Sequence, residues 1–584
     1  MRFSKKLFLG LALVGAATTV SAQSDEVFSP YQKSDLRLPS VPLLLNDPYF
    51  SIWSNYDALN AGPTRHWCEQ EKAMEGLLRV DGTAYRFMGI GMQNLLSPLA
   101  PMAIDDDGWI GRVSHDGQSG TEWAQTGFDD SSWPEEKAAW GTVGEYPNVN
   151  NEWKAENSDI YVRRTVSLTE ADLQKDLWVQ FSHDDVFELY LNGQRIISTG
   201  ETWRQGEQHQ LTSQEKSVLV AGDNVIAAHC HNTAGGAYID FGLYENQLQG
   251  SSTVQKAGQE SVDVMATSSY YTFTCGPVKL DLVFTAPMLI DDLDLISTPV
   301  NYVSYRVTST DGKAHDVQFY LSTSPQMTVN EMNQPTVSSI ITENGVRYIK
   351  SGSSEQKILG RSGDLISIDW GWLYLPATNG QVSVAPATTA EAYFVEHGTL
   401  QQATGEVRST SRSTMPVLAY LHDFGSTQKA ASFTMVGYDE VYDMQYMHKN
   451  YKAYYARDGK TIFQAFDELR DQYADVMQRC RLLDKRIYDD ALAAGNRKYA
   501  EVLAGNYRLV MAAHKLFQDD QGHILYFSKE NKSNGCVNTV DLTYPSCPLF
   551  LTYNPTLQKG MLLSILDYCN SPTWNHDYAA HDIG

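Results

Sequence analysis

Cysteine and positive charge are both scarce in this sequence of 584 residues. Its seven cysteines are too few and too widely spaced for a disulfide scaffold, and no CxxC or Cys/His cluster suggests structural zinc. Lys and Arg number 45 against 70 Asp and Glu, without a basic cluster, so no nucleic-acid partner is expected. GxSxG, HExxH and Walker-type phosphate motifs are also missing from the positions where the surrounding sequence would give them functional meaning. These absences argue against a disulfide-rich scaffold, a structural zinc site and a nucleic-acid-binding protein, but they do not indicate which reaction the protein catalyses.

Apolar and aromatic residues are plentiful instead. Hydrophobic residues make up 42% and aromatic residues 11% of the sequence, which excludes global disorder. The length predicts roughly four domains. The aromatic content favours β structure and carbohydrate-like ligands.

The first 22 residues have the order of a secretory signal. Arg2, Lys5 and Lys6 precede an apolar run that ends in small residues at Ala22. The apolar run is shorter than the roughly 20 residues that a membrane span needs. We therefore expect an exported protein, periplasmic, at the cell surface or extracellular, with no membrane span in the mature chain.

Two β-rich regions follow a mixed segment, residues 23–105. In residues 106–250, Leu177, Val179 and Phe181 alternate with polar residues, and Asn192-Gly193 predicts a hairpin turn. In residues 255–443, short alternating runs such as Val317 to Leu321 predict a β-sandwich.

Residues 444–584 change to a helical period. Apolar residues recur at spacings of three or four, and Asn554-Pro555 predicts a helix start. The predicted stripe consists of Phe463, Phe466, Leu469, Tyr473, Val476, Cys480 and Leu483, continued by Leu492, Tyr499, Leu503, Tyr507, Val510 and His514, and after Pro555 by Leu557, Leu562, Ile565 and Leu566. Because these helices are too few to close a layer around one core, we expect the helical domain to continue beyond Gly584.

Several phrases resemble the secreted glutaminase A-like family of bacteria and fungi. They lie at residues 36–54, 64–67, 291–295, 369–374, 437–440, 538–546 and 581–584. The resemblance implies a multidomain β-plus-α fold, in which a β-sandwich precedes an (α/α)6-type helical toroid that begins within residues 444–584. It makes residues 23–105 the N-terminal family segment.

Residues 106–250 depart from that family pattern and look like an inserted module. Phe128 to Trp133, Leu189 to Gly193 and Gly222 to Ile226 resemble the galactose-binding-like jelly rolls attached to sugar hydrolases. The acidic pairs Asp129-Asp130 and Asp184-Asp185 are either calcium ligands or ordinary turn residues.

A polar loop between predicted helices holds the first catalytic candidates. Hydrolysis without a cofactor needs a general acid and a general base, and a carboxylate pair can supply both. Asp541 and Glu530 are the candidate catalytic carboxylates, with Asn538, Thr539 and Tyr544 as substrate-binding candidates. The alternative is structural: a turn in the loop and a helix cap at Asp541.

His581 and Asp582 form the second catalytic candidate. A histidine acts as a base near neutral pH, and a neighbouring carboxylate fixes its tautomer. A loop hydrogen-bond network is the alternative. Trp370 and Asp439 are further substrate-binding candidates, although their neighbourhood also suits packing between domains. We expect no metal and no cofactor.

The leading functional hypothesis follows from the resemblance: hydrolysis of L-glutamine to L-glutamate and ammonia. A glycoside hydrolase of the same architecture is the first alternative, and a non-catalytic carbohydrate-binding protein is the second. The expected partner is a small-molecule or glycan substrate, and the sequence leaves the oligomeric state open.

Overall fold

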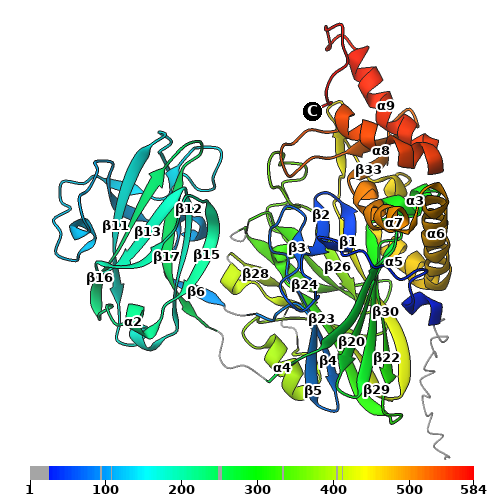
Figure 1. The fold of residues 1–584 in the computed structure, drawn as a ribbon, viewed down its shortest axis with the longest axis horizontal. Helices are drawn as coiled ribbons and strands as arrows, with labels where there is room; N and C mark the ends of the chain where they lie inside the picture. Colours follow the sequence, from blue (N-terminus) through cyan, green and yellow to red (C-terminus); the bar gives the residue numbers. More distant parts are fainter. Residues whose placement is uncertain are drawn as a thin grey trace, which may run out of the picture.

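The computed structural model describes residues 25–584 except 93–94, 107, 248–252, 332–333, 403–404 and 411. The predicted export signal, residues 1–22, lies outside the described residues. Two β-rich bodies and a C-terminal helical region make up the fold, and one β-rich body stands to the left of the rest (Figure 1). Among the described helices, none combines the length and the apolarity that a membrane crossing requires.

The body at the left of Figure 1 is a sandwich of two six-stranded sheets. One sheet consists of β6 (Leu96–Ala100), β9 (Trp140–Gly141), β10 (Asn151–Glu152), β12 (Leu177–Asp184), β15 (Arg204–Gln210) and β17 (Tyr238–Asn246). The other sheet consists of β7 (Ile110–Ser114), β8 (Glu135–Lys137), β11 (Ser158–Leu168), β13 (Val186–Leu191), β14 (Gln194–Ser198) and β16 (Gly222–Asn232). We call residues 96–246 the jelly-roll module. Its short helices are α1 (Ala103–Asp106) and α2 (Ser213–Lys216).

The local sequence patterns explain this sandwich. Leu177, Val179 and Phe181 point into its core, at 1%, 0% and 4% exposure, because alternate residues of a strand face the same side. Asn192 and Gly193 join β13 to β14 with φ of 48° and 86°, as the predicted hairpin turn requires.

The chain enters and leaves the jelly-roll module through strands that are neighbours in space. Its β6 pairs antiparallel with β17, so the two ends of the module lie side by side. On the other body, β5 (Thr83–Met88) pairs in parallel with β18 (Gln255–Lys256). The module therefore begins at Leu96, before the predicted boundary at residue 106, because β6 completes its sheet.

The second body is a larger sandwich. Its six-stranded sheet contains β18, β5, β4 (Met74–Val80), β23 (His315–Thr323), β29 (Val417–Thr427) and β27 (Gln381–Ala385). Its nine-stranded sheet contains β19 (Gly258–Val264), β20 (Ser268–Cys275), β21 (Val278–Thr285), β22 (Val300–Ser309), β30 (Lys429–Asp439), β26 (Trp372–Pro376), β25 (Val346–Ser353), β24 (Thr336–Glu343) and β28 (Val407–Ser409). Helices α3 (Leu293–Ser297) and α4 (Ala390–His397) lie in its connections.

Residues 23–105 do not stand apart as one segment. Strands β4 and β5 belong to the six-stranded sheet of the large sandwich, whereas β6 belongs to the jelly-roll module. A separate three-stranded sheet is formed by β1 (Val41–Asp47), β2 (Phe50–Ser54) and β3 (Arg65–His66). Phe87 of β5 stacks on Phe319 of β23, so the early strands help to build the main core.

The C-terminal region contains helices around a β-hairpin. The helices are α5 (Ile462–Asp471), α6 (Tyr473–Ala494), α7 (Arg497–Met511), α8 (Val540–Tyr553) and α9 (Pro555–Cys569). The hairpin consists of β33 (His514–Gln518) and β34 (Ile524–Ser528), and a smaller hairpin of β31 (Met444–Tyr446) and β32 (Lys449–Tyr451) precedes α5. Helix α6 packs against α7, and α8 against α9.

The predicted helical stripe is right in α5 and α6 and only partly right in α7 and α9, where Tyr507, Leu557 and Ile565 are buried. Phe466, Leu469 and Val476 are buried, but Leu503 of α7 is 37% exposed. The buried side of α7 combines the small residues Ala500 and Ala504 with larger ones, including Tyr507, which the stripe predicted. The stripe also fails at Leu492, Tyr499, Leu562 and Leu566, which are exposed, and at His514, which lies in a strand.

Helix α9 begins as predicted. Asn554 accepts a hydrogen bond from the Thr556 backbone N–H at 3.1 Å, and Pro555 occupies the first turn. Leu557 and Ile565 are buried on its inner side.

Helices α5 and α6 cover the outer face of the nine-stranded sheet. Tyr302 of β22 donates its hydroxyl to the Leu469 carbonyl at 2.7 Å, and Tyr473 stacks on Phe433 at a centroid distance of 3.8 Å. The approach is closest at Gly437 of β30, where an added Cβ would lie 2.6 Å from the Phe466 ring. A glycine is needed there so that α5 can pack on the sheet.

Candidate functional site

Two polar segments that are far apart in the sequence meet beside the start of α8. Val537 donates its N–H to the Gly584 carbonyl at 2.8 Å, and Ile583 donates back to the Val537 carbonyl at 3.0 Å. Val540 donates to the His581 carbonyl at 2.8 Å. These bonds bring the two sets of predicted catalytic residues to one place, which we call the α8 site (Glu530, Asp541, His581 and Asp582).

His581 lies between two carboxylates at the α8 site. Its Nδ1 is 2.8 Å from Asp582 Oδ2, and its Nε2 is 3.6 Å from Asp541 Oδ1. The hydrogen bond to Asp582 raises the pKa of His581, and the negative charge of Asp541 adds to the rise. The imidazole is thereby favoured in its protonated, proton-donating form. The side chains of His581 and Asp541 are 61% and 74% exposed, so a ligand can reach both from solvent.

Glu530 reaches the same place from the residues after β34. Its carboxylate accepts a hydrogen bond from the Thr539 hydroxyl, and its backbone N–H bonds to the Cys536 carbonyl at 3.0 Å. Thr539 is the N-cap residue of α8, so Asp541 lies in the first turn of the helix rather than at its cap. A carboxylate in the first turn is favoured by the helix dipole.

Cys536 is part of this arrangement, and sequence reasoning did not assign it a role there. The ligand atoms of Cys536, His581 and Asp582 all lie within 4.8 Å of one another, so this is where the described residues could hold a metal ion. Burial raises the pKa of the Cys536 thiol, and Asp582 raises it further. Cys536 does not pair with Cys547, whose thiol instead contacts the Thr543 carbonyl at 3.2 Å.

The other predicted loop residues have different surroundings. Asn538 is fully buried, and its side-chain amide donates to the Met561 carbonyl and to Ser564 Oγ, each at 2.7 Å. It therefore fastens the loop to α9. Tyr544 is 80% exposed, one turn after Asp541 in α8, and presents its ring to solvent.

Trp370 and Asp439 belong to the large sandwich. Trp370 is 1% exposed and packs against Tyr49 at a centroid distance of 5.4 Å. Asp439 ends β30, and its carboxylate accepts the Val441 N–H at 2.9 Å. Burial raises the pKa of Asp439. Trp370 helps to form the contact between the sandwich and the helical region.

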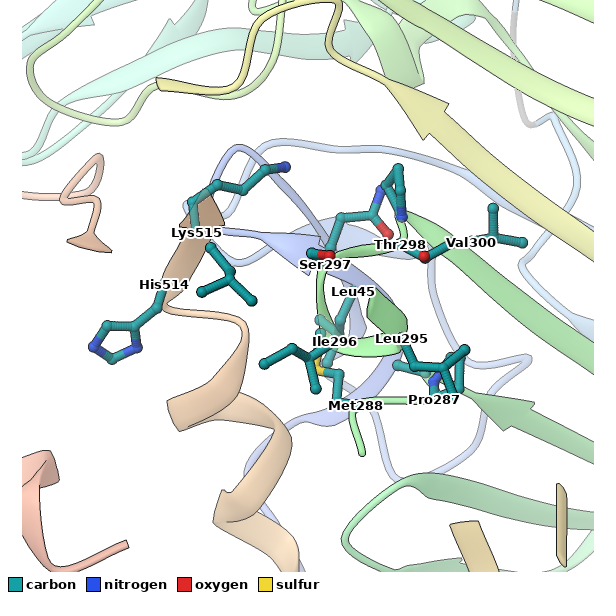
Figure 2. Close-up of a pocket in the computed structure, with 14 residues that line it drawn as sticks. Leu45, Pro287, Met288, Leu295, Ile296, Ser297, Thr298, Val300, His514 and Lys515 are labelled. Atoms are coloured by element: carbon teal, nitrogen blue, oxygen red, sulfur yellow. The ribbon is translucent and has the colours of Figure 1, made fainter. Parts of the chain in front are cut away.

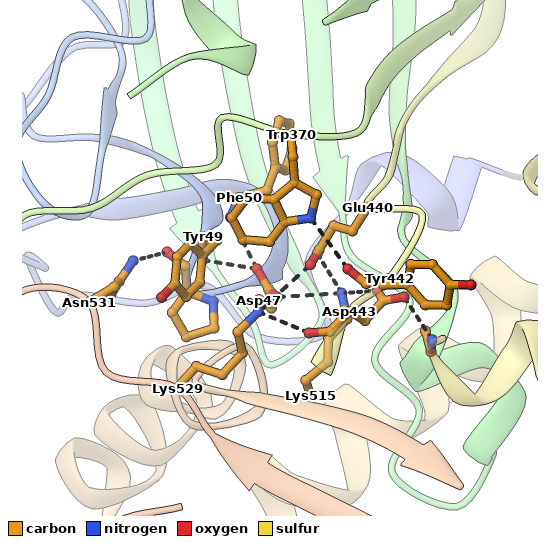
Figure 3. A network of polar contacts seen from close by, with 12 residues as sticks. Asp47, Tyr49, Phe50, Trp370, Glu440, Tyr442, Asp443, Lys515, Lys529 and Asn531 are labelled. Carbon is orange, nitrogen blue, oxygen red and sulfur yellow. Dashed lines mark hydrogen bonds and ion pairs between the residues drawn. The ribbon is translucent and has the colours of Figure 1, made fainter. Parts of the chain in front are cut away.

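A buried ionic cluster fills that contact (Figure 3). We call Asp47, Glu440, Asp443, Lys515 and Lys529 the buried cluster. Lys515 Nζ is 2.6 Å from Glu440 Oε1, 2.8 Å from Asp443 Oδ1 and 3.4 Å from Asp47 Oδ2. Lys529 Nζ is 3.1 Å from Asp47 Oδ2 and lies 4.3 Å from the centre of the Tyr49 ring. The lysines come from the helical region and the acids from the sandwich side.

The two lysines decide the charge states within the buried cluster. Burial would raise the pKa of Asp47, but Lys515 and Lys529 outweigh it and hold that pKa well below its ordinary value. Burial raises the pKa of Glu440, and the negative charge of Asp47 adds to the rise. Glu440 Oε2 has no hydrogen-bond partner among the described residues, and Lys529 Nζ lies 3.7 Å from it. With Glu440 neutral, two ammonium groups face two carboxylates.

The acidic pairs of the jelly-roll module are bound to protein groups. Asp184 accepts the Tyr146 hydroxyl, and Asp185 accepts the Thr233 N–H at 2.8 Å. Asp130 pairs with Arg163 at 2.7 Å. None of these pairs belongs to a group of metal-ligating atoms among the described residues.

A small pocket lies between β33 and the turn that precedes α3 (Figure 2). Leu45, Met288, Ile296 and His514 line it, and its volume of about 10 Å³ holds about one water molecule. It is too small for a substrate.

Comparison with protein families gives three matches along the chain. Residues 12–100 match a domain of unknown function (DUF4964), and residues 267–490 match another (DUF5127). Residues 496–584 match the glutaminase A six helical-hairpin domain. The first two matched ranges lie on either side of the jelly-roll module, and the third contains the α8 site.

Curated relatives include two fungal proteins. The chain is 29% identical to "Glutaminase A" of Aspergillus oryzae over 342 residues, 56% of this chain and 48% of the relative. It is 23% identical over 329 residues to a "Probable glutaminase" of Arthroderma benhamiae, covering 53% of this chain and 37% of the relative. The chain thus spans about half or less of these relatives.

Solved structures add little. A glycosyl hydrolase family 2 member from Bacteroides cellulosilyticus matches with 8% identity and a TM-score of 0.20, over 56% of this chain and 30% of the other. A β-glucuronidase of Bifidobacterium dentium matches with 12% identity and a TM-score of 0.23, over 49% and 45%. Similarity this low bears on neither fold nor function. The match of residues 496–584 to the glutaminase A six helical-hairpin domain and the similarity to the two fungal proteins together support a glutaminase A-like family for this chain.

Proposed function

We propose that this protein is an exported glutaminase-like hydrolase that converts L-glutamine to L-glutamate and ammonia. The observation that carries the proposal is the meeting of Asp541, His581 and Asp582 at one exposed place. Glu530 lies near enough to influence the pKa of His581. This place lies within residues 496–584, the range that matches the glutaminase A helical-hairpin domain.

The proposed chemistry is general acid–base hydrolysis. A water molecule adds to the side-chain amide carbon of glutamine while Asp541, the more exposed carboxylate, accepts its proton. His581, kept protonated by Asp582, gives a proton to the departing nitrogen, which leaves as ammonia. One water is consumed, and glutamate and ammonia are formed. Glu530, oriented by Thr539, is the second carboxylate available as base.

Product analysis tests the proposal. The recombinant protein, expressed from its whole reading frame, is incubated with L-glutamine and with a panel of glycosides. We expect ammonia and glutamate from glutamine. Reducing sugar from glycosides without ammonia would contradict the proposal and favour a glycoside hydrolase. Absence of both products, together with retention on a glycan affinity column, would favour a carbohydrate-binding protein.

Export is a separate part of the proposal and rests on residues 1–22. Their basic start and apolar run have the order of a secretory signal. Cell fractionation tests it: the natural protein should leave the cytoplasm and lose the signal, whereas a variant without residues 2–22 should stay inside. Equal distribution of the two would contradict export.

A further inference from the structure

A thiol, an imidazole and a carboxylate converge where the end of the chain lies beside the start of α8 (Figure 1). Cys536 comes from the loop before α8, whereas His581 and Asp582 come from the C-terminal segment. Their ligand atoms all lie within 4.8 Å of one another, and no other three such side chains of the described residues do so. Cys536 is half-buried, and the side chains of His581 and Asp582 are 61% and 25% exposed, so an ion can reach the group from solvent.

We propose that Cys536, His581 and Asp582 bind a divalent ion of the zinc type and that the bound ion switches off the α8 site. Zinc takes cysteine sulfur, imidazole nitrogen and carboxylate oxygen as ligands. The thiolate disfavours magnesium and calcium, which prefer oxygen. Three protein ligands leave the fourth position of a tetrahedral zinc ion for water.

Backbone hydrogen bonds hold the two contributing segments together. Val537, the residue after Cys536, donates its N–H to the Gly584 carbonyl at 2.8 Å and accepts the Ile583 N–H at 3.0 Å. Cys536 and Asp582 are therefore both next to paired backbone rather than on separate loops. Because the segments are already joined, little of the binding free energy is lost in bringing the ligands together.

Neighbouring groups also orient two of the ligands. Asp582 Oδ1 accepts the Gly584 N–H at 3.0 Å, which leaves Oδ2 facing His581 Nδ1 at 2.8 Å. The other ring nitrogen, Nε2, is 3.6 Å from Asp541 Oδ1. A ligating histidine usually points its second N–H at such a carboxylate. Asp541 is thus placed to support His581 when Nδ1 binds the ion.

The ion and the proposed hydrolysis compete for His581. In that hydrolysis His581 is the protonated acid and Asp582 stabilises its charge. A ring whose Nδ1 is bound to zinc cannot hold the second proton that makes it an imidazolium, and Asp582 is then engaged by the ion. Zinc should therefore stop ammonia release. This inhibitory part rests on the proposed function, whereas the binding part rests on the geometry alone.

Titration of zinc chloride into the full chain, prepared without a histidine tag, tests the binding part. By calorimetry we expect one bound zinc ion per chain, and Cys536→Ser should abolish this binding. Asp541→Asn should weaken it by about 10–100-fold, the usual effect of losing a carboxylate behind a ligand. Cobalt chloride gives a second readout, because a cobalt–thiolate bond absorbs in the near ultraviolet, and Cys536→Ser should remove that band.

A matched control separates this thiol from its neighbour. Cys547→Ser removes another half-buried thiol close by, one that contacts the Thr543 carbonyl at 3.2 Å, and should leave zinc binding unchanged. Asp582→Asn should also abolish binding, which serves if Cys536→Ser fails to fold by circular dichroism. No zinc binding by the natural protein, or binding that survives both Cys536→Ser and Asp582→Asn, would overturn the proposal.

Ammonia release from glutamine tests the inhibitory part, with each protein compared with its own rate in a chelator. Stoichiometric zinc should stop the natural protein but not Cys547→Ser carrying Cys536→Ser, which lacks the site. An unchanged or faster rate in the natural protein with zinc bound would overturn inhibition. Failure of the proposed function would show differently, as absence of ammonia even in the chelator, while calorimetry still decides whether the ion binds.

Discussion

Lys515 and Glu440 lie in contact, with 2.6 Å between Nζ and Oε1, although Lys515 belongs to the β33–β34 hairpin of the C-terminal region and Glu440 follows the last long strand of the sandwich. Both side chains are buried, at 4% and 0% exposure. The buried cluster around this contact stabilises the fold only while each of its charges keeps a partner, because an unpaired buried charge is costly. The buried cluster therefore makes the docking of the helical region sensitive to single charge changes.

Asp47→Asn should destabilise the protein much more than Glu440→Gln. Asp47 is the ionised partner of both lysines, so removing its charge should lower the free energy of unfolding by about 3–5 kcal/mol. Glu440 is favoured in its neutral form, and Gln resembles that form, so its loss should be about 1 kcal/mol. Urea unfolding followed by tyrosine and tryptophan fluorescence measures both free energies of unfolding.

The control is Lys449→Met, which breaks an exposed pair with Asp520 and should cost under about 1 kcal/mol. Equal losses for Asp47→Asn and Glu440→Gln would contradict the assigned charge states.

Stability should fall at alkaline pH through Glu440. Its pKa is raised from the ordinary carboxyl value of 4.5 to about 8 in the folded protein. A raised pKa contributes stability below the unfolded value, and this contribution is lost as the pH rises through the folded value. Between about pH 5 and 9, natural protein should therefore lose stability relative to Glu440→Gln, which does not titrate. Thermal melting of both proteins at each pH measures the difference, and a constant difference would argue against a neutral Glu440.

Asp541→Asn should abolish ammonia release from glutamine while leaving the fold intact. The side chain is 74% exposed, so the free energy of unfolding should change by less than about 1 kcal/mol. The measurement is ammonia production beside a denaturant curve. Asp577→Asn is the matched control, because Asp577 is exposed in the nearby C-terminal segment and has no proposed role. Full activity in Asp541→Asn would remove this residue from the catalytic set.

The pKa of His581 should depend on Asp582. The hydrogen bond from Nδ1 to Asp582 favours the protonated imidazole, so Asp582→Asn should lower the pKa of His581. An NMR titration of the His581 ring protons, assigned with His581→Gln, reads this directly. If His581 is the acid, the alkaline limb of the rate profile should move to lower pH in Asp582→Asn. An unchanged ring titration would mean that the two side chains are not hydrogen-bonded in solution.

Local sequence patterns predicted the local structure well. Alternation identified the strands around Leu177 and Val317, and Asn554-Pro555 identified the start of α9, because neighbouring residues decide strand faces and helix caps. The same reasoning succeeded at Tyr507 of α7 but failed at Leu503. Periodicity assumes that the largest apolar residues face inward, whereas Ala500 and Ala504 do so here because small side chains let the helix approach its neighbours.

Long-range proximity was predicted only in part. The loop around Asp541 and the segment around His581 were each recognised as candidates, but nothing in their spacing indicated that they touch. The buried cluster was not foreseen, since Asp47, Glu440 and Lys515 come from three distant segments. One signal was present: Lys515 and Lys529 adjoin the apolar residues of a hairpin, where a charged side chain needs a partner.

The side-by-side ends of the jelly-roll module have a consequence for the history and engineering of the chain. Strands β5 and β18 are neighbours in the six-stranded sheet of the large sandwich, and β6 and β17 are neighbours in the jelly-roll module. Inserting or removing the module therefore leaves the strand order of the large sandwich unchanged. Relatives can therefore differ by this whole unit while keeping the same core. Transplanting residues 96–246 onto a foreign scaffold would require only two adjacent attachment points.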